Sequence, residues 1–229
     1  MSVWRAAGFA FALVAAAPAA AQVPPSPDEI AGYRGMHAAA QRGDVATIEA
    51  LAAASRTALE TRNRQGRTPL HVATFARQRG ALGALLRLGA NHAALEAGRY
   101  DAVTIAAVAD DEDSLRLLLA AGVSAKLVTS RYDGTALIAA AHLGHSGVVR
   151  QLVGAGAPLD HVNNLHWTAL IESIVLGDGG PRHQATLQIL LDAGASHALP
   201  DREGRTPLQL ARVRGYDAMV RALLAAGAR

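Results

Sequence analysis

The chain has 229 residues, of which 51% are hydrophobic, 18% are charged and 4% are aromatic. This composition can bury a core and excludes a disordered chain, and its richness in Ala and Leu favours helices over strands. The net charge of +3 is too small to indicate a nucleic-acid partner without a concentrated basic face, so we expect none. The chain has no cysteine, which excludes disulfides, thiolate metal ligands and a cysteine nucleophile.

Residues 1–21 have the order of regions that is typical of a secretory signal peptide. MSVWR carries one positive charge, an apolar run follows it, and Ala19-Ala20-Ala21 forms a small-residue cleavage site before Gln22. The apolar run is short for a bilayer-spanning helix, although an uncleaved anchor is the alternative. We therefore expect a protein that is periplasmic or secreted and that has no membrane attachment after cleavage.

A proline-rich leader follows at residues 22–31. The sequence VPPSP at 23–27 favours the polyproline conformation, so we expect a stiff, extended segment there. The rest of the chain, residues 32–229, is predicted to form one domain.

This domain contains three sequence markers that recur with a common period. The phrase GRTPLHVA at 66–73 returns as GRTPLQLA at 204–211. Its threonine has an equivalent in every intervening unit: Thr68, Asp101, Thr135, Thr168 and Thr206. These positions are separated by 33, 34, 33 and 38 residues. An aliphatic pair such as Leu85-Leu86 and a following glycine such as Gly89 recur in phase, which indicates stacked structural units.

Each marker has a physical role in a helix–turn–helix unit. The threonine hydroxyl can cap a helix by accepting a hydrogen bond from a backbone N–H, and aspartate does the same at position 101. Proline suits the first helical position, where its missing N–H costs nothing. The glycine after the aliphatic pair can adopt the left-handed conformation that closes the second helix. Each unit is therefore predicted to contain two helices and an extended connector.

TPLHVA, TPLQLA, the turn at Gly144-His145 and the LLxxGA endings resemble the ankyrin repeat. The resemblance covers residues 32–229 and implies an all-α solenoid of helix–turn–helix units with short hairpin-like connectors. The expected repeats are residues 32–65, 66–98, 99–132, 133–165, 166–203 and 204–229. The third repeat departs from the motif with DAVT at 101–104, and the first has Arg34 in the cap position.

No catalytic motif is recognisable, so we predict a protein that is not an enzyme and binds no cofactor. The sequence has no G-x-S-x-G, HExxH, phosphate loop or EF-hand. His142 and His145, with His161 and His166 nearby, are the strongest candidates for zinc ligands. Spacing alone does not define a tetrahedral ligand set, so we predict no metal. A histidine-based metal-binding or enzymatic protein is the alternative.

The resemblance also implies where a partner would bind. The first helix of each unit lines a concave face, and the connector tips lie beside it. Aromatic and arginine side chains dominate binding hot spots. On this register the predicted partner-binding residues are Arg67, Phe75, Tyr100, Tyr132, His142, Leu143, Leu165 and Trp167. The alternative is that the rings only pack against neighbouring connectors.

We therefore predict a monomeric protein–protein interaction module, an adaptor, inhibitor or support protein that binds a protein partner through its concave groove. A self-associating structural spacer, whose groove buries a second copy, is the other alternative. The spacing of 38 residues places five additional residues within 176–183. Gly and Pro predict a loop there, which is either functional or a tolerated insertion.

Overall fold

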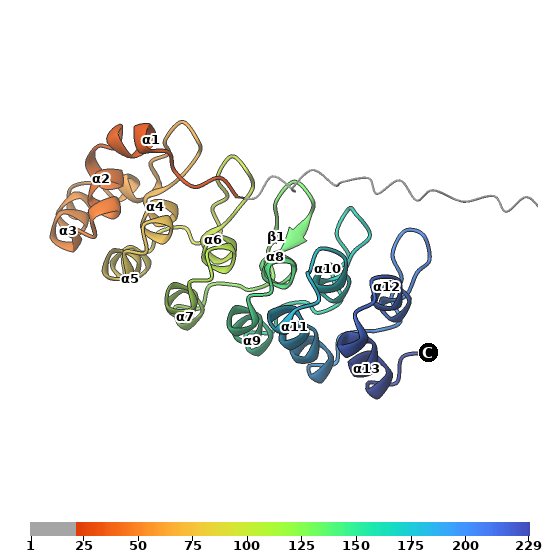
Figure 1. Ribbon diagram of the computed structural model, residues 1–229. Coiled ribbons are helices and arrows are strands. Elements are labelled where there is room, and N and C mark those ends of the chain that lie inside the picture. Colours follow the sequence, from red (N-terminus) through yellow and green to blue (C-terminus); the bar gives the residue numbers. More distant parts are fainter. Residues whose placement is uncertain (1–21) are drawn as a thin grey trace, which may run out of the picture.

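The computed structural model describes residues 22–229, and the predicted signal peptide at 1–21 lies outside this range. Helices form two parallel rows along one axis (Figure 1). The first row contains α2 (Gly35–Arg42), α4 (Pro69–Phe75), α6 (Ala102–Val108), α8 (Ala136–Leu143), α10 (Ala169–Val175) and α12 (Pro207–Val213). The second row contains α3 (Val45–Ala54), α5 (Arg79–Arg87), α7 (Glu112–Ala120), α9 (Ser146–Gly154), α11 (Pro181–Asp192) and α13 (Asp217–Ala225).

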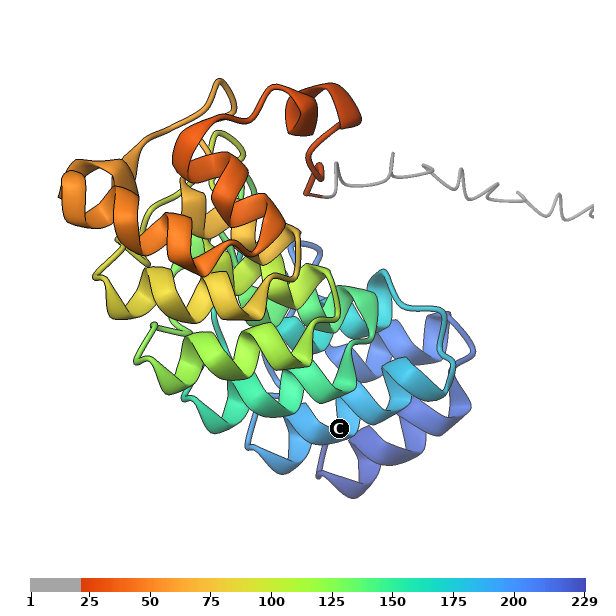
Figure 2. The same cartoon turned by 90° about the vertical axis from the view of Figure 1, so that its left-hand side faces the viewer.

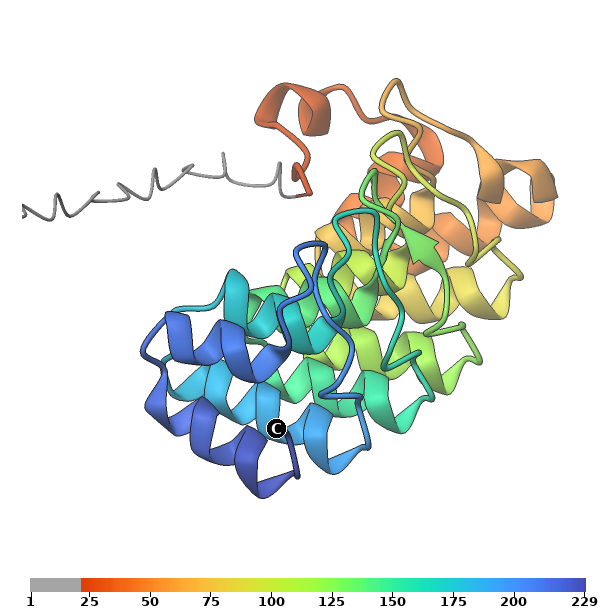
Figure 3. The same cartoon turned by 90° about the vertical axis from the view of Figure 1, so that its right-hand side faces the viewer.

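Each first-row helix packs on its own second-row helix and on its neighbours in the same row. The predicted all-α solenoid of helix pairs is thus confirmed. Connectors project beside the first row and line up along the stack (Figure 3). The connector before α8 contains an antiparallel pair of short strands, β1 (Val128–Thr129) and β2 (Gly134–Thr135). A 3₁₀-helix, η1 (Arg56–Glu60), follows α3.

The capping residues set the starts of the first-row helices as predicted. Asp101, Thr135, Thr168 and Thr206 each accept a hydrogen bond from the backbone N–H three residues later. Thr68 and His71 form a reciprocal capping box. In it the backbone N–H of Thr68 donates a hydrogen bond to His71 Nδ1 at 3.0 Å. Gln209 serves the same purpose in the last repeat, where its Oε1 accepts from Thr206 N–H at 2.9 Å. The helices therefore begin where local chemistry satisfies their orphan donors.

The core lies between the two rows and is built from small and aliphatic side chains. Leu70, Leu137, Leu170 and Leu208 are fully buried, as are the alanines that follow them by three residues in three of these units. Serine replaces that alanine at position 173 and is equally buried. Small residues at this position let adjacent helices approach closely, so burial extends continuously from one unit to the next.

The N-terminal segment differs only in part from the extended leader that we predicted, because residues 22–26 lie outside any helix and residues 27–31 are helical. Helix α1 (Pro27–Ala31) begins inside it, with Pro27 at the first helical position and Ser26 as the cap. Glu29 of α1 receives hydrogen bonds from Tyr33 and Asn63 as well as an ion pair from Arg67. These polar contacts hold the segment against the first repeats, and Figure 2 shows its position there. Proline here starts a helix rather than extending the chain.

The predicted loop at 176–183 is shorter than expected. Helix α11 begins at Pro181, so Arg182 and His183 are helical, and α11 has 12 residues where α9 has 9. Pro181 occupies the first helical position and therefore opens the helix. The additional turn reaches back across the fourth repeat, where Arg182 pairs with Asp110 at 2.7 Å and His183 Nε2 lies 2.9 Å from the His142 carbonyl. The insertion thus joins repeats three and five, which are not neighbours in the stack.

Candidate protein-binding groove

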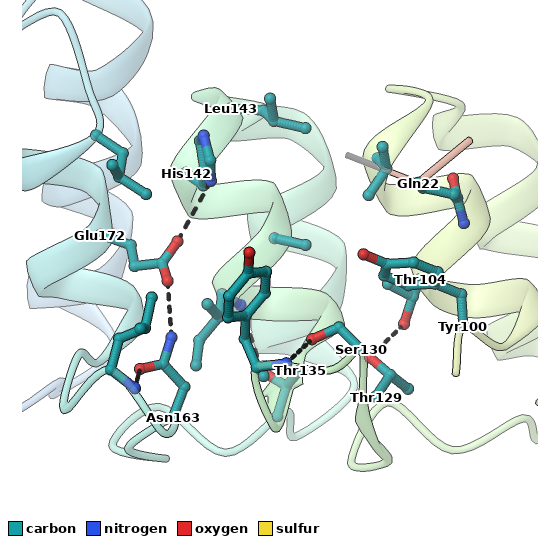
Figure 4. A pocket seen from close by; sticks show the side chains of 17 residues that line it. Gln22, Tyr100, Thr104, Thr129, Ser130, Thr135, His142, Leu143, Asn163 and Glu172 are labelled. Atoms are coloured by element: carbon teal, nitrogen blue, oxygen red, sulfur yellow. Dashed lines mark hydrogen bonds and ion pairs between the residues drawn. The ribbon is translucent and has the colours of Figure 1, made fainter. Parts of the chain in front are cut away.

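A cavity of about 310 Å³ lies on the connector side of the first-row helices, between repeats three, four and five. Its walls come from α6, α8, α10, the connectors that precede these three helices, and Gln22 of the N-terminal segment. Figure 4 shows Tyr100 and Thr104 on one side, Glu172 and Asn163 on the opposite side, and His142 with Leu143 on the helix between them. This volume is at the lower end of the roughly 300–1,000 Å³ of small-molecule pockets and suits one or two side chains.

Most of the lining is apolar or aromatic, and its polar groups are largely engaged with each other. The hydroxyls of Thr104 and Thr129 lie 3.1 Å apart, and Ser130 Oγ accepts from Tyr132 N–H at 3.2 Å. Burial, with the nearby Glu96 carboxylate, raises the pKa of Tyr100, so its phenol keeps its proton at neutral pH. An apolar lining with a few oriented polar groups is the general character of a recognition site.

Glu172 on α10 is the one carboxylate of the cavity lining, and only 5% of its surface is exposed. Its Oε1 accepts a hydrogen bond from Asn163 Nδ2 at 2.8 Å. Its Oε2 lies 3.5 Å from His142 Nδ1, the nearest group in residues 22–229 that can carry a positive charge. The site therefore combines an apolar cleft with a single buried acid (Figure 4).

Five of the eight predicted partner-binding residues line this cavity: Tyr100, Tyr132, His142, Leu143 and Leu165. They come from repeats three and four and meet because α6, α8 and α10 are adjacent. Leu143 is 36% exposed, which is high for a large hydrophobic side chain. It lies at the open mouth of the cavity. The register implied by the ankyrin resemblance was therefore sufficient to bring these side chains together.

Arg67 and Phe75 do not belong to this cavity, and the prediction for Arg67 is wrong. Arg67 is only 3% exposed because the N-terminal segment lies over it. Its guanidinium binds Glu29 at 2.7 Å, donates to the carbonyl of Val23 and lies 4.7 Å from the centre of the Phe75 ring. The chain itself thus occupies the position where a partner was expected.

Trp167 also lies outside the cavity. It is half-buried against the hydrophobic core, and its backbone N–H donates to Asn163 Oδ1 at 3.0 Å. The Trp167 ring is thus partly covered by the hydrophobic core.

The histidines that suggested zinc do not converge. His145 Nδ1 lies 2.9 Å from the Ala107 carbonyl, and His161 Nε2 lies 2.6 Å from the Asp133 carbonyl. His166 is an exposed connector residue with a φ of 63°. Throughout residues 22–229, no three His, Asp or Glu side chains are grouped to hold a metal ion. His145 joins repeats three and four through a backbone carbonyl, and His161 joins the connector before α10 to the connector before α8.

Several lining residues were not predicted at the sequence level, and two of them are Glu172 and Gln22. Glu172 had a readable signal, because it interrupts the apolar helix ALIESIV in a position that holds Val72, Ile105 and Leu210 in other repeats. Gln22 had none, since its position depends on how α1 folds back on the stack.

Comparison with known proteins agrees with this architecture. The family model for three copies of the ankyrin repeat matches residues 103–201, and the single ankyrin-repeat model matches residues 203–229. YahD of Escherichia coli (strain K12), which is named as an ankyrin repeat protein, is 36% identical over 191 residues, covering 83% of this chain and 94% of YahD. The chain therefore belongs to the ankyrin-repeat proteins.

Solved structures show the same likeness. An ankyrin repeat domain from Acinetobacter baumannii AYE is 41% identical, with a TM-score of 0.79, covering 85% of this chain and 98% of that domain. The ankyrin repeat domain of Bcl-3, a member of the IkappaB protein family, is 26% identical with a TM-score of 0.77, covering 86% of this chain and 88% of that domain. The fold of this chain is that of a protein–protein interaction module.

Proposed function

We propose that this protein is exported and binds a protein partner through the groove between repeats three and five. The observation that carries the proposal is the mouth of the cavity, where Tyr100, Tyr132 and Leu143 leave an apolar cleft open to solvent on a rigid scaffold. Aromatic and aliphatic side chains in a concave, partly desolvated site are typical anchors for a partner. The protein acts as an adaptor, an inhibitor or a support protein, and catalyses no reaction.

Export is supported by the order of charged, apolar and small residues in 1–21. Among the helices within 22–229, none is long and apolar enough to cross a membrane. We propose that the mature chain begins at Gln22 and works in the periplasm or outside the cell. Intact-mass measurement of the protein recovered from the periplasmic fraction tests this, and a mass that retains residues 1–21 would contradict cleavage.

A comparative pull-down tests the groove. Tagged protein is incubated with an extract of exported proteins, as wild type and as the groove variant Tyr132→Ala/Leu143→Ala. The matched control is Leu117→Ala/Leu224→Ala, which removes exposed leucines of 38% and 45% exposure from the second-row helices. We expect the groove variant to lose the bound protein and the control to keep it, with both folded by circular dichroism. Loss from the control alone would overturn the groove assignment.

Sedimentation of the same variants tests the monomer against a self-associating spacer. We propose a monomer at micromolar concentration. A dimer that dissociates on the Tyr132→Ala/Leu143→Ala change, but not on the second-row change, would favour the spacer instead.

A further inference from the structure

The position of Glu172 differs from that of its equivalents in the other repeats. The fourth residue after the capping threonine or aspartate is Val72, Ile105, Ala139 and Leu210 in the four other repeats that have such a cap. Val72, Ile105 and Leu210 are buried. In the fifth repeat the residue is glutamate, and it is as deeply buried as its apolar equivalents. A scaffold that packs well with aliphatic side chains at this position gains nothing in packing from a carboxylate.

Each oxygen of the Glu172 carboxylate has one polar neighbour in the described part of the chain, but only Oε1 receives a hydrogen bond. Asn163 holds Oε1 at 2.8 Å, which fixes the orientation of the group. Oε2 receives no hydrogen bond from residues 22–229, and its nearest neighbour that can be positive is His142 Nδ1 at 3.5 Å. Burying a carboxylate is costly unless a positive group compensates it. An oriented carboxylate that lines a cavity, with only the His142 contact at Oε2, is suited to an incoming cation.

We propose that the partner inserts a lysine side chain into this cavity, with its ammonium group against Glu172 Oε2. This rests on the proposed groove-binding function and names the chemistry of the partner. The aliphatic part of lysine would pack against the apolar lining, which includes Leu143, Leu165 and Leu176, while its charged end reaches the acid. A volume of about 310 Å³ accommodates one such side chain together with part of the backbone that carries it.

Lysine fits this site better than arginine because Oε1 is already in use. Asn163 holds Oε1, so a guanidinium that forms two parallel hydrogen bonds with the carboxylate would have to share that oxygen with the amide. A lysine ammonium is a point charge and needs only the remaining oxygen at this residue. The occupant is therefore a protein segment that presents lysine, and arginine serves as a comparison in the test.

Titration followed by ¹⁵N-edited NMR tests the proposal without knowledge of the partner. The probes are Nα-acetyl-lysine N-methylamide, its uncharged match Nα-acetyl-norleucine N-methylamide and the arginine analogue. We expect the lysine probe to shift the amide signals around Glu172 and Ala139 and to bind about tenfold tighter than the norleucine probe, as one charge-assisted hydrogen bond would give. The arginine probe is expected to bind between the two.

Two variants locate the effect. Glu172→Gln keeps the shape and the Asn163 contact, and we expect it to remove the advantage of lysine over norleucine. Asp133→Asn removes an exposed rim carboxylate that pairs with Arg99 at 3.0 Å, and we expect it to leave that advantage in place. Equal binding of the lysine and norleucine probes, absence of shifts at Glu172, or an unchanged preference in Glu172→Gln would each overturn the inference. The pull-down on the groove variant stands independently of these results.

Discussion

The connector side of the stack has two stretches that differ in what covers them. Arg67 in repeat two and Tyr100 in repeat three occupy the same register position, one residue before the helix cap. Arg67 is buried beneath α1, where Glu29 neutralises it. Tyr100 borders the open cavity. The repeat register determines where a side chain points, but the segment that precedes the repeats determines which stretch remains available to a partner.

This difference has a physical origin in Glu29. Helix α1 has only five residues, and a helix this short is unstable on its own. It is held by a buried network in which Glu29 Oε1 accepts from Tyr33, Asn63 and Arg67 at 2.7 to 2.9 Å. The covered end of the groove is thus a consequence of one buried ion pair and the residues around it.

Breaking that pair gives the largest effect that we expect. Arg67→Ala leaves the carboxylates of Glu29 and Glu96 without their buried cation, and the side chains of Arg67 and Glu29 are only 4% and 10% exposed. We expect a loss of about 3 kcal/mol in the free energy of unfolding, measured by guanidinium chloride denaturation. Arg205→Ala is the control, because it occupies the same register position in repeat six with a side chain that is 46% exposed. If Arg205→Ala lowers the free energy of unfolding as much as Arg67→Ala does, the burial of Arg67 beneath α1 contributes nothing to stability.

Repeat two has His71 at the position where repeat six has Gln209, so of these two repeats we expect only repeat two to make stability depend on pH through this position. Burial disfavours the charged ring and lowers the pKa of His71 from 6.5 to about 4, although the hydrogen bonds from Nε2 to the carbonyls of Ala94 and Tyr100 act in the opposite direction. In the unfolded chain the ring binds a proton more readily, so stability falls as pH drops from about 6.5 towards 4 and is fully present above that window. The full effect is about 3 kcal/mol.

His71→Gln tests this effect, because Gln209 already performs the same capping in repeat six. Urea unfolding between pH 4.5 and 7.5 should show a shallower loss of stability for the variant than for wild type. Parallel pH profiles would contradict the role that we assign to His71.

The loop between α10 and α11 of repeat five provides a smaller effect than the two above. Gly179 has a φ of 70°, and a side chain there would meet the Tyr216 ring at 2.5 Å. Tyr216 Oη donates to the Gly177 carbonyl at 2.9 Å, which joins repeats five and six beside the groove. Gly179→Ala should lower the free energy of unfolding by about 2 kcal/mol, through both backbone strain and the clash.

Gly204→Ala isolates the backbone contribution. Gly204 has a φ of 77°, and nothing lies within 4 Å of the position that its side chain would take. We expect a loss of about 1 kcal/mol, from the left-handed conformation alone. Thermal or denaturant unfolding measures both variants. If Gly204→Ala is less stable than Gly179→Ala, the contact between position 179 and Tyr216 is not tight.

Most of the fold was predictable from the sequence because its determinants are local. Capping residues such as Thr168 and closing glycines such as Gly194 act within a few residues, and the structure has both in the expected conformation. The start of α11 was not predicted, because Pro181 was interpreted as a helix breaker although proline also suits a first helical turn.

The candidate site was only partly predictable. Tyr100, Tyr132 and Leu143 were identified because register alone brings them to the same face. Arg67 was assigned wrongly because its cover comes from α1, which no repeat rule describes. Glu172 was missed because only the exposed positions of each first helix were considered, whereas this residue acts from a buried one. A charge inside an apolar helix was the available signal.

Site-specific photo-crosslinking tests the central claim that the open stretch between repeats three and five contacts the partner. A benzophenone amino acid replaces either Leu143, at the mouth of the cavity, or Leu117, which is similarly exposed on α7 in the second row. Each protein is then illuminated in the extract of exported proteins. We predict a covalent adduct with another protein from position 143 and none from position 117. An adduct from position 117 alone, or one from position 143 only to a second copy of this chain, would contradict the account.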